Sequence, residues 1–241
     1  QTGEHKAAVR PAMNLRTTDG NILFISAAEG GKPSGSLKAV SAYDGSEWKL
    51  TLKDSSRSGF QIKRVCASEG NLYIEYEGAE TDENEYISGY VIENNSISHY
   101  GRLAKVTDGS GTVKIAKSSI PDNGSLYVYN EQYNGDKYTD YAGEAKLIGL
   151  SSPTSVIDVT SELMGLTSDG KPYAERYTTY KATLTPASGN YMLPESITVT
   201  AGGTELVLNK DYRYDPETGE LQIAVMPETG ALTITASGVK K

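Results

Sequence analysis

The sequence is poor in several features that would point to particular classes of protein. Its 241 residues include one cysteine and two histidines, and its formal net charge is −8. The single cysteine, Cys66, excludes an internal disulfide, although surface proteins of reducing habitats often have none. No apolar run is long enough for a transmembrane helix, so we expect no membrane insertion in this segment. Because nucleic acids and anionic membranes bind basic surfaces, the acidic charge argues against both as partners.

The scarcity of histidine also limits the chemistry that the chain can perform. Neither His5 nor His99 has a second histidine at metal-ligand spacing, which argues against a zinc site or a catalytic triad. The acidic stretch 80–85 lacks EF-hand spacing, so we interpret it as a solvated turn, with a calcium site as the alternative. The segment "GGTE" at 202–205 is expected to be a hairpin rather than a phosphate-binding loop. We therefore expect no enzymatic activity, no cofactor and no metal.

Alternation of apolar and polar residues is the main signal that is present. "NLYIEYEG" at 71–78 places Leu72, Ile74 and Tyr76 on one face, and "WKLTLK", "SITVTAG", "TELVLN", "ELQIAV" and "ALTITA" repeat the pattern. A period of two is typical of half-buried strands, and turn signals such as "YDGSE" and "DPETGE" lie between them. The pattern predicts an all-β chain of tandem immunoglobulin-like antiparallel β-sandwiches. Only "VIDVTSELMGL", 156–166, could be a helix.

Pro153 marks the expected boundary between two sandwiches, because proline cannot donate to a sheet ladder. We predict an N-terminal segment at 1–57, which contributes strands to the first sandwich, then sandwiches at 58–150 and 151–241. Each of the last two ranges has about the length of one immunoglobulin-like domain.

Tyrosine is concentrated at 127–144, "YVYNEQYNGDKYTDYAGE", which holds five of the 17 tyrosines. Asn134-Gly135 predicts a two-residue hairpin turn with both residues at positive φ. Leu126 and Val128 should then point into the core, Tyr127 and Tyr129 away from it, and Asp136, Lys137 and Asp140 should lie near the turn. The alternative is a ligand platform formed by Tyr133, Tyr138 and Tyr141 together with Trp48. Trp48 shares a face with Leu50 and Leu52, which favours a core or inter-domain position over sugar stacking.

Three stretches resemble bacterial surface proteins. "VRPAMNL" at 9–15 resembles the closing motif of a C-type-lectin-like module related to the formylglycine-generating enzyme. "WKLTLKDSSRSGF" and "EQYNGDKYTDYA" resemble segments that follow that module in large cell-surface proteins of Gram-positive anaerobes. "YKATLTPASGNYMLPESITVTAGGTELVLNKDYRYDPETGELQI" resembles an immunoglobulin-like surface repeat, except that "GNYML" stands where the repeat has Gly-Tyr before Leu-Pro.

The resemblance implies a non-catalytic structural spacer of a secreted, extracellular surface protein. Its partners would be the neighbouring domains of a longer chain, including an adhesive or lectin-like module. The second hypothesis is a module that binds a host glycan or protein through the tyrosine-rich hairpin. A third is an accessory domain of a surface hydrolase.

Overall fold

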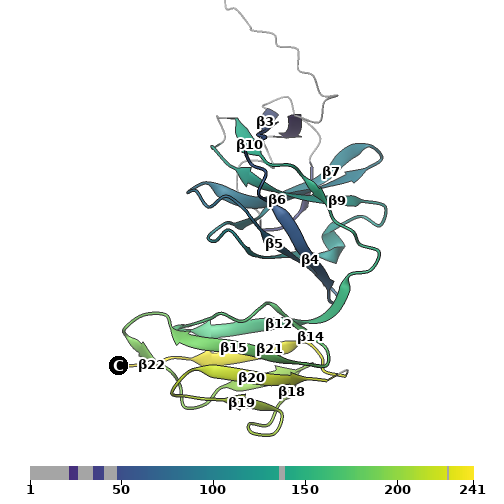
Figure 1. The fold of residues 1–241 in the computed structure, drawn as a ribbon. Coiled ribbons are helices and arrows are strands. Elements are labelled where there is room, and N and C mark those ends of the chain that lie inside the picture. The colour runs from purple at the N-terminus through teal and green to yellow at the C-terminus, as the bar shows by residue number, and fades with distance from the viewer. Residues whose placement is uncertain (1–21, 27–34, 41–47, 136–138, 227) are drawn as a thin grey trace, which may run out of the picture.

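The computed structural model describes residues 22–26, 35–40, 48–135, 139–226 and 228–241 (Figure 1). The described residues form β-strands and one short 3-10 turn, η1 (Lys117–Ser119), with no α-helix among them. Figure 1 shows two bodies, one above the other, connected by a short linker. The prediction of an all-β chain of tandem antiparallel sandwiches is confirmed.

The N-terminal sandwich packs a small sheet against a large one. The small sheet has the order β4 (Gln61–Ala67), β5 (Asn71–Glu77), β8 (Gly111–Ala116). The large sheet has the order β7 (Ser96–Lys105), β6 (Glu85–Glu93), β9 (Ser125–Gln132), β10 (Asp140–Ala142). When the strands are numbered in chain order from β4, the first, second and fifth form the small sheet. The third, fourth, sixth and seventh form the large sheet that packs against it. This is an immunoglobulin-like division, except that the fourth strand lies in the sheet of the third and sixth strands rather than with the first, second and fifth.

Strands from the first 57 residues extend the large sheet. β3 (Trp48–Lys53) pairs with β10, β1 (Ile22–Ser26) pairs with β3, and β2 (Lys38–Ala39) pairs with β7. β11 (Lys146–Leu147) pairs with β9 after a short break and continues the line of β10. The chain then passes Pro153 into the second sandwich.

The C-terminal sandwich divides its strands between two sheets in a different order. One sheet has the order β13 (Leu166–Ser168), β15 (Thr178–Pro186), β20 (Glu220–Val225), β19 (Tyr212–Tyr214). The other contains β12 (Thr154–Met164), β21 (Leu232–Ser237), β17 (Thr198–Ala201) and β18 (Thr204–Glu205). β14 (Tyr173–Glu175) pairs with β12, and β16 (Tyr191–Met192) pairs with β22 (Val239–Lys240). The helix candidate 156–166 is thus mostly strand β12, consistent with its β-branched residues.

Two glycine-dependent turns shape this sandwich. Gly165, at φ 69°, lets the chain cross from β12 in one sheet to β13 in the other, and a Cβ there would lie 2.5 Å from the Tyr191 ring. Gly202 and Gly203, at φ 56° and 82°, form the two-residue turn between β17 and β18. The prediction of a hairpin at 202–205 is confirmed.

Each sandwich has its own apolar core, made by the inward faces of its two sheets. In β5 the predicted alternation holds, because Leu72, Ile74 and Tyr76 lie in the N-terminal core while Tyr73 points to the other side of the sheet. The C-terminal core includes Val159, Leu184, Val199, Ile223 and Ile234.

Candidate functional site

The junction between the sandwiches is the first candidate site. β12 begins in the junction, where Thr154 and Ser155 pair in parallel with Cys66 and Ala67 of β4. One sheet therefore runs through both sandwiches, in the order β18-β17-β21-β12-β4-β5-β8. In Figure 1 the end of β4 meets the chain at the start of β12. Such pairing restricts rotation of one sandwich against the other.

A small apolar cluster fills the junction behind this pairing. Cys66 and Tyr73 come from the N-terminal sandwich, and Val156 and Tyr173 from the C-terminal one, and all four are buried. The rings of Tyr73 and Tyr173 lie 5.1 Å apart between centroids. Cys66 is a buried free thiol, and burial raises the pKa of that thiol.

Charged and polar pairs surround the cluster. The Tyr73 hydroxyl and the Asn71 amide donate to the two oxygens of Asp158, at 2.6 and 3.0 Å. Arg64 donates from both terminal nitrogens to Glu175, at 2.5 and 3.0 Å. These bonds join the small sheet of one sandwich to β12 and β14 of the other. The two bonds between Arg64 and Glu175 form a bidentate pair with fixed geometry.

The carboxylates of the junction are held in their ionised form. Burial alone would raise the pKa of Asp158, but hydrogen bonds from Ser68, Tyr73 and Asn71 outweigh it and lower that pKa. The bond from Arg64 lowers the pKa of Glu175. For Glu75, burial is again outweighed, here by bonds from Lys171 and Tyr173, and the pKa is lowered. The polar contacts across the junction are therefore intact at neutral pH.

The outer face of the large sheet is the second candidate site. Its cross-strand registers place Leu147, Tyr127, Tyr90 and Tyr100 in one row across β11, β9, β6 and β7. The rings of Tyr90 and Tyr127 are stacked at 5.0 Å with an interplanar angle of 11°. Exposure increases along the row, from 2% at Tyr100 to 61% at Leu147. We call Leu147, Tyr127 and Tyr90 the aromatic shelf.

A buried charge cluster lies beside the shelf. Arg102 approaches Glu131 at 3.3 Å (Nε to Oε2) and donates to Asp140 at 3.2 Å (Nη2 to Oδ2). The hydroxyls of Ser88 and Tyr100 donate to Glu131, at 2.5 and 2.9 Å. Side-chain exposure is 0% for all three charged residues, so two carboxylates share one guanidinium in the protein interior.

Burial dominates the electrostatics of this cluster. It raises the pKa of Glu131, and the nearby Asp140 adds to the effect, although Arg102 and the bonds from Ser88 and Tyr100 oppose it. The hydroxyl of Tyr129 and Oγ1 of Thr51 are buried beside these groups, and neither makes a hydrogen bond within the described residues. Burial also raises the pKa of Tyr129 well above its ordinary value.

A second buried pair lies at the start of β6. Arg57 donates 2.7 Å from Nη1 to Glu85 Oε2 and makes a second bond from Nη2 to Oε1. Asn130 donates to the same carboxylate at 2.9 Å and accepts from the Glu80 amide. The interpretation of 80–85 as a solvated turn is therefore wrong for Glu85, which is fully buried, whereas Asp82 and Glu83 are exposed.

Of the four predicted platform residues, the structure describes the side chains of two, Tyr133 and Tyr141. Tyr133 contacts Arg102, whose Cζ lies 3.7 Å from the ring centroid, and meets Tyr86 edge-on. Tyr141 pairs with Gln132, on the opposite face of the ladder from Glu131 and Ala142. Tyr138 and the side chain of Trp48 lie outside the described residues.

The hairpin prediction needs correction. Because Tyr141 pairs with Gln132, the connection between β9 and β10 is longer than two residues, and of the two predicted turn residues only Gly135 has a positive φ, 86°. Asn134 instead donates its amide N–H to Asp140 Oδ1 and its side-chain NH₂ to Thr139 O, both at 2.8 Å. Asp140 is fully buried rather than exposed near a turn. The inward direction of Leu126 and Val128 is as predicted, but Tyr129 is buried in a second cluster on the outer face.

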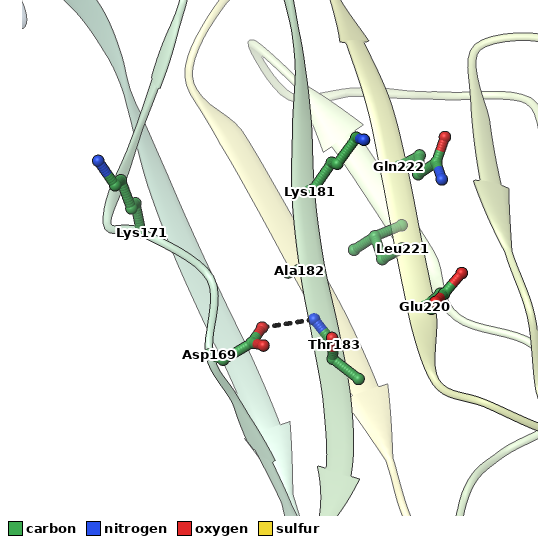
Figure 2. A pocket seen from close by; sticks show the side chains of 8 residues that line it. All are labelled: Asp169, Lys171, Lys181, Ala182, Thr183, Glu220, Leu221 and Gln222. Atoms are coloured by element: carbon green, nitrogen blue, oxygen red, sulfur yellow. Dashed lines mark hydrogen bonds between the residues drawn. The ribbon is translucent and has the colours of Figure 1, made fainter.

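A depression on the C-terminal sandwich is less promising. Figure 2 shows it between the loop of Asp169 and Lys171 and the outward side chains of β15 and β20, and its volume is about 400 Å³. Asp169 accepts a hydrogen bond from the Thr183 amide, and Lys171 is paired with Glu75 across the junction. No aromatic ring lines the depression, so a stacked ligand has no platform there.

Two kinds of site are absent from the described residues. No group of three or more His, Cys, Asp or Glu in that part of the chain could hold a metal ion. No helix there is long and apolar enough to span a membrane.

Comparisons with known proteins do not assign the chain to a family. No protein-family model matches the chain, and no curated protein matches it. Among solved structures, the I9–I11 tandem from titin matches over 90% of this chain and 87% of that chain, at 10% identity and a TM-score of 0.16. The assignment to immunoglobulin-like sandwiches therefore rests on the topology of the chain itself.

Proposed function

We propose that the chain is a non-catalytic structural spacer of a secreted bacterial cell-surface protein, which holds an adhesive or lectin-like module away from the cell envelope. The continuous sheet across the junction carries this proposal. A spacer must transmit orientation, and β12 is shared between the two sandwiches through its pairing with β4. The buried cluster and the bidentate Arg64–Glu175 pair support the same role.

Distances between spin labels on the two sandwiches test the rigidity that a spacer needs. Lys105 and Ala224 are exposed on different sandwiches and can carry the labels, because the buried Cys66 is not accessible to the reagent. We expect one narrow distance distribution for the otherwise unchanged chain. A broad distribution would contradict the proposal.

Asp158→Ala should broaden that distribution, since it removes the acceptor for Tyr73 and Asn71. The loss in stability should be about 1–3 kcal/mol, the usual cost of a buried polar group without a partner. Asp215→Ala is the control, because it removes a carboxylate that caps the turn before β20. The control should leave the distribution narrow.

The aromatic shelf supports a second candidate function, the binding of a host glycan or protein. Sugar rings pack on tyrosine faces, and the shelf becomes more exposed towards Leu147. A glycan array probed with the whole chain tests this function. If a glycan binds, Tyr127→Ala should abolish the signal, whereas Tyr177→Ala, which removes a 78% exposed tyrosine of the other sandwich, should not. An array without signal would contradict glycan binding.

A further inference from the structure

The described strand ladders are antiparallel with three exceptions. β3 pairs in parallel with β10 over three residue pairs, β12 with β21 over six, and β12 with β4 over two. β12 is the first strand of the C-terminal sandwich and β21 is the last of its main strands. The β12–β21 ladder therefore joins in parallel the strand by which the chain enters this sandwich and the last of its main strands.

This geometry determines how the sandwich meets a pulling force. Tension along the chain acts on the N-terminal end of β12 and on the C-terminal end of β21. In a parallel pair these two points lie at opposite ends of the ladder, so the evenly spaced hydrogen bonds are loaded together. In a hairpin the two pulled ends lie side by side, and the bonds break one after another. Figure 1 shows the chain entering the C-terminal sandwich near β14 and leaving at the other end, near β22.

We propose that the tandem bears tension along its chain and that the β12–β21 ladder is the principal mechanical clamp. The inference rests on the proposed spacer function, which it deepens. The corresponding β3–β10 ladder has three pairs against six, so the N-terminal sandwich should open at the lower force. β1 is antiparallel to β3, with Ile22 opposite Leu52, and should detach first.

The backbone directions in β12 provide a matched pair of variants. The Val159 N–H donates to Pro172 O, away from β21, while Met164 O accepts from Gly238, just beyond β21. Because alternate residues of a strand direct their N–H and C=O to opposite edges, Thr160 bonds towards β21 and Ser161 away from it. Both side chains are exposed. Proline at 160 therefore removes a clamp hydrogen bond, whereas proline at 161 removes none from the clamp.

The first experiment holds the whole chain by tags at residues 1 and 241 and measures lifetimes under constant force. Thr160→Pro should shorten the lifetime of the C-terminal sandwich about tenfold, which corresponds to about 1.4 kcal/mol of barrier. Ser161→Pro should change it less than about threefold. Equal effects of the two substitutions would overturn the proposal.

A second measurement needs no destabilising variant. Handles on the exposed residues Ser152 and Glu228 pull on the neighbouring N-terminal ends of β12 and β21, so the same ladder opens pair by pair. We expect unfolding at a clearly lower force than with terminal handles. An equal or higher force would refute the clamp. The distances between the spin labels test the spacer function independently. If the force measurements refute the clamp but the distance distribution is narrow, only the clamp is refuted and the spacer function is retained.

Discussion

Replacing Arg102 by alanine is expected to destabilise the N-terminal sandwich by about 3–5 kcal/mol, the usual cost of leaving a buried charge without its partner. The guanidinium contacts two buried carboxylates, Glu131 and Asp140, and lies over the ring of Tyr133. Without it, the two negative charges face each other in the interior, beside three tyrosines and away from water. The loss should be smaller in mild acid, where Glu131 takes up a proton. Urea denaturation followed through tyrosine fluorescence measures it.

Lys63→Ala is the matched control. Lys63 forms an ion pair with Glu77 at 3.0 Å, but both side chains are about half exposed. Exposed pairs contribute about 0–1 kcal/mol, so this substitution should barely change the free energy of unfolding. If the two variants lose similar stability, the outer face of the sheet is solvated in solution and the charge cluster is not a core.

The fold could be predicted from the sequence because its strands obey a simple rule. In "NLYIEYEG" the apolar residues Leu72 and Ile74 enter the core, and Tyr73 and Glu75 point the other way, as alternation requires. The short turn at Gly202-Gly203 could also be predicted, since those residues adopt positive φ without strain. Both features depend on residues that are close together in the chain.

The candidate sites depend on residues that are far apart in the chain. Tyr90 and Tyr127 stack because β6 pairs with β9 in one register, and no local pattern fixes that register. Alternation was misleading at Thr51 and Asp140, which pair side by side on the outer face and are buried there. A polar residue on an outward face predicts exposure, unless a second layer covers that face. The signal that could have found the cluster was the tyrosine content itself, because half-buried rings need polar neighbours.

The charge of Glu131 also predicts an unusual dependence of stability on pH. Burial raises the pKa of this carboxyl in the folded protein above its ordinary value of 4.5. A raised folded pKa means that the folded state binds the proton more tightly than the unfolded state does. The resulting stabilisation is fully present below about pH 4.5 and is lost as the pH rises through the folded pKa. Within that window the slope should approach about 1.4 kcal/mol per pH unit.

Glu131→Gln should remove this slope and make the protein more stable than the unchanged chain at pH 8. The amide is close in size to the carboxyl and can still accept from Ser88 or Tyr100, while Arg102 keeps Asp140 as a partner of opposite charge. The junction carboxylates Asp158, Glu75 and Glu175 have lowered pKa values, so their contribution is lost only as the pH falls below the ordinary range of carboxyl groups. The two effects thus occupy different pH windows. Free energies of unfolding between pH 4.5 and pH 8 separate them, and parallel curves for the two proteins would show that Glu131 is ionised throughout.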